Sequence, residues 1–372
     1  MQLPRMTPLS ELSIFELSEL VEGRNWDPLE LLSAIRTTSF QDLIDFEIYP
    51  PIFRRLELTD ASLAPLTTVV CCREVKDLLT DSLLAAIVDR FVGSLDQQNP
   101  NLELLTLVLT LVTGHNPSKQ KFLQRHALLE RVVERLDKNW ANGCEFFSIL
   151  AALLAEDDSI AHPALVFARD RLVDNLESTR GLVLKFRDHP QVLTVVMVCC
   201  VGVTTRVFAI DDGWLSWSVK QLVSSGQQTL SSAQFIRHIS FGDEMKPHVW
   251  SLIQPILPFY IKQAAGNPKL SNHLFGTLAN LCLRTPELAQ NACMQFPSII
   301  ALAERTLLGA KKNDRQLVQV LQFLRILGKT ENIAQFFDAL TDLHQNCVNP
   351  VVRRIADEII HARKSSLNED IS

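Results

Sequence analysis

The chain has 372 residues, a formal net charge of −6 at pH 7, and a composition that is 47% hydrophobic with only 13 glycines and 2 tyrosines. This length exceeds one ordinary compact core, which predicts several domains or a repeat array, and the shortage of glycine and tyrosine favours an all-α fold over a sheet protein. Charges of both signs are scattered, which argues against a nucleic-acid partner. Two small basic patches, whose ordinary role is a solvated loop or helix face, keep that alternative open: Lys119, Lys121 and Arg125, and Lys311, Lys312 and Arg315.

The N-terminal segment predicts helices that cap a larger array. Residues 7–21 form the first predicted helix, with Thr7 as N-cap and Pro8 at the first helical position. Residues 29–56 are expected to hold a degenerate repeat, because terminal repeats need a polar outer face. Residues 1–56 are therefore predicted to be N-terminal helices and a capping repeat.

Neither the start of the chain nor its most apolar stretch indicates a membrane protein. Residues 1–23 carry acidic side chains through the apolar stretch and lack the basic start of a secretory signal. The most apolar window, residues 192–203, covers about a dozen residues, whereas roughly 20 are needed to cross a bilayer. We expect a buried core helix there, no membrane insertion, and a location in the cytoplasm, with the nucleus as a further compartment.

From residue 57 onward an aliphatic pair recurs at a nearly constant interval. The anchors follow one another in steps of 42 or 43 residues, and each has a second aliphatic residue three positions earlier. An i, i+3 pair at constant spacing is typical of the buried edge of a helix. The anchors are Val69, Leu111, Leu153, Val196, Ile239, Leu281 and Leu324, and their partners are Leu66, Val108, Leu150, Leu193, Ile236, Leu278 and Leu321.

Two shorter helical patterns follow each anchor, which gives a three-helix unit of the length found in armadillo and HEAT repeats. The run LANLC at residues 278–282 resembles the end of an armadillo third helix, and residues 286–294 resemble the first helix after it. The resemblance implies an all-α, right-handed α-solenoid of armadillo-like repeats of about 42–43 residues. This solenoid would cover residues 57–362 with a C-terminal capping helix at 350–362, and the polar residues 363–372 are expected to be a disordered tail.

The sequence contains no phosphate-binding glycine loop and no HExxH motif, so no enzyme activity, cofactor or small-molecule substrate is expected. The eight cysteines include no CxxC pair and are interpreted as small buried hydrophobic residues. Trp214 and Trp217 are interpreted as core, with an exposed binding ridge as the alternative. A capped turn between repeats is favoured over a metal site at four residues: His238, Asp243, Glu244 and His248.

The resemblance also implies where a partner protein would bind. Armadillo third helices line the concave side, and members that clasp extended peptides use an Asn just before the anchor and a Trp four residues earlier. Only Asn280 matches this ladder and no Trp does, so a groove of the nuclear-import kind is doubtful. The predicted partner-binding residues at these two positions are Gln191, Gln234, His238, Asn280, Gln319 and Phe323. For Asn280 a hydrogen bond to the neighbouring repeat, and for Phe323 packing on the last repeat, are the alternatives.

These patterns favour a non-enzymatic protein–protein interaction scaffold or adaptor that binds an unidentified partner protein along the solenoid groove. The alternative is a factor that remodels its client, such as a guanine-nucleotide exchange factor, a chaperone cofactor or an assembly chaperone. A metal-dependent enzyme is a third possibility that depends only on the region around His238.

Overall fold

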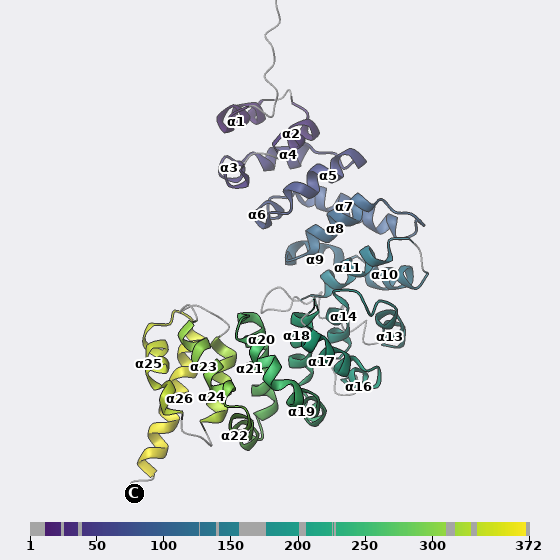
Figure 1. The fold of residues 1–372 in the computed structure, drawn as a ribbon. Helices are drawn as coiled ribbons and strands as arrows, with labels where there is room; N and C mark the ends of the chain where they lie inside the picture. The colour runs from purple at the N-terminus through teal and green to yellow at the C-terminus, as the bar shows by residue number, and fades with distance from the viewer. Residues whose placement is uncertain are drawn as a thin grey trace, which may run out of the picture. The chain divides into compact units, whose positions relative to one another are not determined.

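The computed structural model describes residues 12–23, 26–35, 39–125, 127–138, 141–155, 176–200, 206–224, 226, 228–309, 317–328 and 333–369, without the side chains of 176–178 and 363–369. Within these ranges every regular element is a helix and no strand occurs (Figure 1). No helix in the described part is long and apolar enough to cross a membrane. The all-α prediction is confirmed.

The chain divides into two compact units, residues 1–198 and 199–372. The first unit contains α1 (Ile14–Glu22), α2 (Pro28–Ala34), α3 (Phe40–Asp45), α4 (Tyr49–Arg55), α5 (Asp60–Val69), α6 (Arg73–Lys76), α7 (Asp81–Ser94), α8 (Leu102–Val112), α9 (Asn116–Leu123), α10 (Leu128–Asp137), α11 (Gly143–Leu154) and α13 (Leu176–Lys185). Helix α14 (Val192–Cys199) spans the boundary between the units along the chain.

The second unit continues with further helices and short 3-10 turns. They are α16 (Phe208–Asp211), α17 (Trp214–Ser224), α18 (Thr229–Ile239), η3 (Asp243–Met245), α19 (Lys246–Ile253), η4 (Gln254–Ile256), α20 (Leu257–Ala264), α21 (Pro268–Cys282), α22 (Pro286–Gln295), α23 (Ser298–Gly309), α24 (Leu317–Leu327), η5 (Ala334–Phe336), α25 (Phe337–Asn346) and α26 (Pro350–Glu369).

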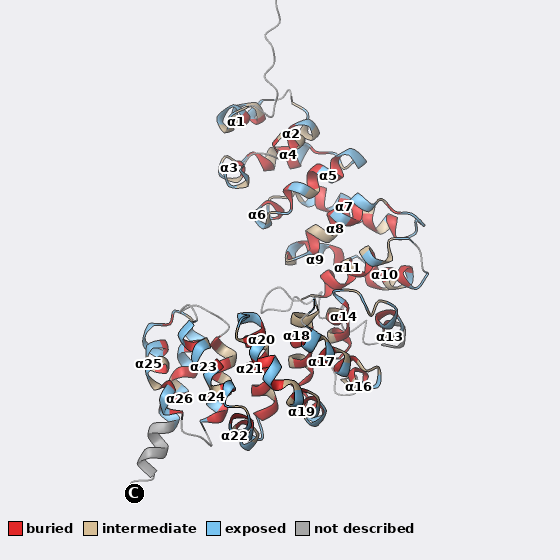
Figure 2. Ribbon diagram, in the orientation of Figure 1, coloured by how far each residue is buried: buried red, intermediate tan, exposed pale blue. Residues whose placement is uncertain are grey.

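The predicted aliphatic pairs define one helix in each repeat, which we call the third helix. Each pair lies within a single helix, in the order α5, α8, α11, α14, α18, α21 and α24, and all fourteen side chains are at most 1% exposed. Helix α8 packs against α5 and α11, and α21 packs against α18 and α24. Figure 2 shows the buried residues concentrated along these helices. The repeat register read from the sequence is therefore confirmed.

The third helices begin where short polar side chains cap them. Asn101 accepts a hydrogen bond from the main-chain N–H of Glu103, and Asn267 accepts from Lys269 and Leu270. Such caps satisfy main-chain donors that have no partner inside the helix. The same amide side chain thus sets the starting point of α8 and α21.

The two ends of the chain differ from the prediction. The predicted cap Thr7 lies outside the described residues, and α1 begins at Ile14 because Ser13 and Glu16 form a capping box. At the other end α26 continues to Glu369, beyond the predicted boundary of the disordered tail at residue 363. The polar composition of this end indicated disorder, but its residues also have helical propensity, and they extend the helix that begins at Pro350.

One residue of the predicted basic patches is not solvated. Lys119 in α9 is only 3% exposed, and its ammonium donates a 2.7 Å hydrogen bond to the carbonyl oxygen of Ala155. Lys121 and Arg125, in contrast, are exposed and pair with Asp81 and Asp89. The interpretation of Lys119 as part of a solvated face was wrong because the side chain folds inward onto the end of α11, the third helix of its own repeat.

Candidate partner-binding surface

The third helices of the first unit expose small, uncharged side chains at the two predicted groove positions. We call the following residues the third-helix face of this unit: Ala64, Thr68, Thr106, Thr110 and Ser148. All are exposed or half-buried. Three threonine hydroxyls donate to the carbonyl oxygen four residues earlier in their own helix, at 2.8–3.0 Å. The hydroxyl hydrogens are thus already used, and the face presents methyl groups and acceptor oxygens.

Acidic residues at the first turns of the third helices border this face. Asp60 opens α5, and Glu103 and Glu145 lie in the first turns of α8 and α11. A carboxylate is favourable there because the start of a helix carries partial positive charge. These carboxylates give the first unit an acidic edge beside its uncharged face.

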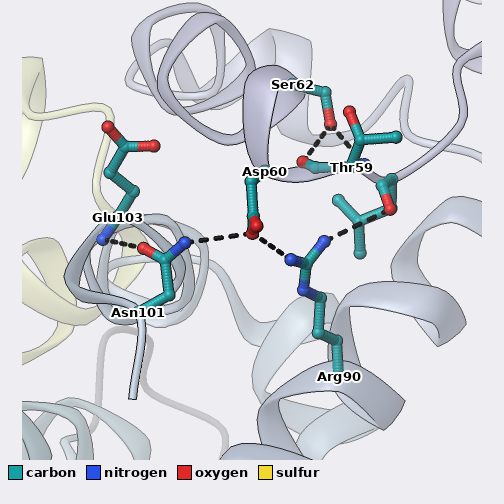
Figure 3. Close-up of polar contacts among 7 residues, drawn as sticks. Thr59, Asp60, Ser62, Arg90, Asn101 and Glu103 are labelled. Atoms are coloured by element: carbon teal, nitrogen blue, oxygen red, sulfur yellow. Dashed lines mark hydrogen bonds and ion pairs between the residues drawn. The ribbon is translucent and has the colours of Figure 1, made fainter. Parts of the chain in front are cut away.

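Asp60 also joins three helices (Figure 3). Its carboxylate accepts hydrogen bonds from the Arg90 guanidinium of α7 and, at 3.0 Å, from the Asn101 amide that caps α8. Arg90 donates a second hydrogen bond of 3.2 Å to the carbonyl oxygen of Leu58. The Asp60 carboxylate therefore holds the starts of α5 and α8 together, and its position is fixed before any partner arrives.

The six predicted partner-binding residues are distributed over both units. Gln191 precedes α14 in the first unit and is exposed. The others lie in the second unit, where Gln234 is exposed and His238 half-buried on α18, and Asn280 and Gln319 are half-buried on α21 and α24. We call Gln234, His238, Asn280 and Gln319 the third-helix face of the second unit.

The prediction that the Phe323 side chain is exposed is wrong. The ring is fully buried and packs on Phe275 of α21, with ring centroids 5.7 Å apart. Helix α24 packs against both α21 and α26, so its buried sector is wider than the stripe of the anchor pair. The residue just before the anchor is also buried in α11, where it is Ala152, and in α14, where it is Val195. Ordinary packing, the alternative named for Phe323, describes its environment.

Asn280 makes the inter-repeat hydrogen bonds that were the alternative to partner contact. Its amide nitrogen donates to the carbonyl oxygen of Arg237 at 3.0 Å and to the Ser240 hydroxyl at 3.1 Å. Both acceptors lie at the end of α18, where carbonyl groups have no partner inside the helix. Asn280 therefore ties α21 to α18.

Sequence reasoning missed Arg237, whose side chain lies on the neighbouring Gly276. A Cβ atom added at Gly276 would stand 2.5 Å from Arg237 Nε and 2.7 Å from Cδ, so only glycine leaves room for this side chain. Burial lowers the pKa of Arg237, and Tyr260 acts in the opposite direction. The signal in the sequence was Gly276 itself, because it occupies the predicted groove position that is Thr106 in α8 and Gln234 in α18.

The residues of the metal-site alternative are arranged as a turn between repeats. The Asp243 carboxylate pairs with Lys246 at 2.7 Å and with Arg284 at 2.5 Å, and the hydrogen bond from Lys246 lowers the pKa of Asp243. Glu244 pairs with Arg206 at 2.9 Å. In the part of the chain that the structure describes, no group of three or more potential ligands could hold a metal ion.

The remaining aromatic and thiol candidates mostly belong to the core. Trp214 is fully buried and meets the half-buried Trp217 edge to face, with centroids 5.8 Å apart. Burial raises the pKa of both Cys199 and Cys282 to about 12, so neither thiol is ionised near neutral pH. Two cysteines, Cys71 and Cys144, are exposed, which differs from the expectation that the cysteines are buried.

Comparisons with known proteins place the fold. No protein-family model matches the sequence, and no curated protein matches it. The chain is similar to an engineered protein solved by crystallography, with a TM-score of 0.50, 16% sequence identity, and coverage of 95% of this chain and 88% of that chain. It is also similar to a chain from a structural study of the interaction between cadherin and beta-catenin, with a TM-score of 0.48, 15% identity, and coverage of 94% and 68%. The second similarity is too low to support a conclusion. The first, together with the repeating third helices, identifies an all-helical repeat fold.

Proposed function

We propose that this chain is a non-enzymatic scaffold or adaptor of armadillo type that holds a partner protein against its third helices. The observation that carries the proposal is the third-helix face of the first unit, which repeats accessible, small, uncharged side chains beside a fully buried anchor pair. A repeating face of this kind offers an extended surface to another chain.

The chemistry of this face suits a protein partner. Because the threonine hydroxyls already donate within their helices, covering them leaves no new unsatisfied donor. Their methyl groups and Ala64 supply the apolar area that is removed from water on binding. In this proposal the chain performs no reaction and needs no cofactor or metal ion.

The proposal is tested by placing a photo-crosslinking amino acid at single positions of the full chain in its native cell. Thr106 and Gln234 probe the third-helix faces. The controls are the exposed residues Ala85 of α7 and Leu308 of α23, which lie on the second helices of their repeats, directly before the third helices α8 and α24. We expect a partner protein to be crosslinked from Thr106, from Gln234, or from both, and we expect that this protein is not crosslinked from the two controls. Crosslinks from Ala85 or Leu308 alone would move the binding surface to the second helices and contradict the proposal.

The crosslinked protein also separates a passive adaptor from a client-remodelling factor. If it is a GTPase or an Hsp70-type chaperone, a nucleotide-release assay with the purified pair measures remodelling directly. A passive scaffold leaves the release rate unchanged.

A further inference from the structure

The third helices of the two units carry opposite charges. Helices α5, α8 and α11 contain the acidic residues Asp60, Glu103 and Glu145 and no Lys or Arg. Helices α18, α21 and α24 contain no Asp or Glu. The basic and imidazole side chains of these three helices are Arg237, His238, Lys269, His273 and Arg325. These three helices therefore contribute only cationic or neutral side chains, which favours an acidic partner segment. Arg325 already pairs with Glu358 of α26.

Arg237 is held within this cationic set by the shape of Gly276. The side chain occupies the space that a Cβ at Gly276 would fill, with Nε and Cδ within 2.5–2.7 Å of that position. Its main-chain carbonyl is fixed in turn by the Asn280 amide and, at 2.7 Å, by the Ser240 hydroxyl. Arg237 is thus positioned on α21 by its neighbours before any partner binds.

This guanidinium has no counter-charge of its own. Among the described residues, the Arg237 side chain makes no ion pair and donates no hydrogen bond, although it is half-buried. A guanidinium removed from water without an anion is unfavourable, and an anion that reaches it recovers this free energy. Arg237 is therefore set to gain from a carboxylate supplied by another molecule.

Two further polar groups near Arg237 lack partners in the described part of the chain. The Tyr260 hydroxyl of α20 is completely buried without a hydrogen bond, and burial raises the pKa of that hydroxyl, while Arg237 lowers it. The His273 Nδ1 atom is also buried and unpaired, and burial, followed by Arg237, lowers the pKa of His273 to about 4. A phenol, and an imidazole whose Nδ1 carries the proton, are hydrogen-bond donors, and the described part of the chain uses neither of these two groups.

We propose that Arg237, seated on Gly276 and flanked by Tyr260 and His273, binds a carboxylate of an acidic partner segment. This inference rests on the proposed function, since it assigns the chemistry of what the third helices of the second unit hold. The planar guanidinium fork matches a carboxylate with two parallel hydrogen bonds, which gives orientation as well as affinity. The acidic edge of the first unit repels an acidic segment, so such a segment binds to the third helices of the second unit.

The test uses the full chain and a short fluorescent oligo-glutamate peptide as the probe, with binding followed by anisotropy at low ionic strength. We expect the oligo-glutamate to bind and an oligo-glutamine peptide to bind at least about tenfold more weakly, the scale of one charge-assisted hydrogen-bond pair. Arg237→Ala should weaken oligo-glutamate binding by a similar factor. Arg237→Lys keeps the charge and loses the fork, so it should recover only part of the affinity.

A matched control separates this site from general charge attraction. Arg284→Ala removes the same charge from the exposed turn after α21, where the guanidinium already pairs with Asp243, and should change binding less than about twofold. Gly276→Ala keeps every charge and displaces the Arg237 side chain, so it should weaken binding as Arg237→Ala does. Circular dichroism confirms that each variant is folded.

Three outcomes would overturn the inference. Equal losses in Arg237→Ala and Arg284→Ala would show non-specific attraction, and wild-type binding by Arg237→Ala would show that the carboxylate binds elsewhere. A phosphoserine peptide that binds more tightly than oligo-glutamate through Arg237 would replace the carboxylate by a phosphate. Crosslinking from Thr106 or Gln234 without any effect of Arg237 would refute this site and leave the proposed function intact.

Discussion

Lys119 of α9 donates its buried ammonium to the carbonyl oxygen of Ala155, the residue that closes α11, at 2.7 Å. Lys76 of α6, one repeat earlier, donates in the same way to the carbonyl oxygens of Thr110 and Thr113 at the end of α8. The last carbonyls of a helix have no partner inside it and carry partial negative charge. In both cases a lysine in the first helix of a repeat therefore caps the third helix of the same repeat.

This arrangement predicts that Lys119→Met is destabilising although it keeps the length of the side chain. The variant should lose about 1.5–3 kcal/mol of unfolding free energy, the scale of a hydrogen bond to a charged group. Urea denaturation followed by circular dichroism measures the loss. Lys121→Met, two residues away, removes an exposed ion pair with Asp81 and should cost at most about 0.5 kcal/mol. Equal effects of the two variants would refute the capping role of Lys119.

The repeat register predicts a similar contrast on α21. Leu281 is 1% exposed and Leu283 is 50% exposed, so Leu281→Ala should cost about 2–5 kcal/mol through lost burial and a cavity. Leu283→Ala should stay within about 0.5 kcal/mol of the wild type. Denaturation of Leu281→Ala at the wild-type urea midpoint would show that the register is misplaced.

The hydrogen bonds of Asn280 predict that it contributes mainly to stability. Asn280→Ala removes the donors to the Arg237 carbonyl and the Ser240 hydroxyl and should cost about 1–2 kcal/mol. Asn291→Ala, at an exposed position on α22, is the control and should change stability by less than about 0.5 kcal/mol. A fully stable Asn280→Ala chain would return this residue to the set of partner contacts.

The lowered pKa of His273 predicts a specific dependence of stability on pH. Burial, followed by Arg237, lowers the pKa of His273 to about 4, whereas the unfolded chain keeps the ordinary histidine pKa of about 6.5. Above about pH 6.5 both states are neutral and His273 contributes no pH dependence. As the pH falls from about 6.5 to about 4, only the unfolded state binds the proton, so the folded state loses stability, on the order of 1–3 kcal/mol in total.

His273→Gln should therefore lose less unfolding free energy than the wild type between about pH 7 and pH 4.5, as measured by urea denaturation at both values. The exposed His248, changed to Gln, is the control and should follow the wild type. If His273→Gln and the wild type lose the same amount, His273 is protonated in the folded protein and its environment differs from the one described.

The sequence predicted the parts of this fold that depend on one helix alone. The pair Leu278 and Leu281 could be placed because a buried edge repeats along the chain with a fixed spacing, and burial follows directly from that periodicity. The burial of Phe323 could not be predicted from its own helix, since it depends on Phe275 of another helix and on the neighbours on both sides of α24. Contacts across repeats were missed for the same reason.

Arg237 illustrates the part of the candidate site that pattern reasoning cannot reach. Its role depends on the missing side chain at Gly276 and on Tyr260 of α20, two residues that lie far from Arg237 in the sequence. Lys119 is similar, because a lysine read alone is a solvated cation, and only the end of α11 explains its burial. Asn280 was the exception, since both its possible roles followed from its position before an anchor.

The most direct measurement of the central claim is the affinity of the purified crosslinked partner for paired surface variants. Thr106→Arg with Gln234→Glu alters both third-helix faces, and Ala85→Arg with Leu308→Glu makes the same changes on the second helices. Isothermal titration should show at least about a tenfold loss of affinity for the first pair and less than about a twofold change for the second. Unchanged affinity of the first pair, or a greater loss in the second, would contradict binding along the third helices.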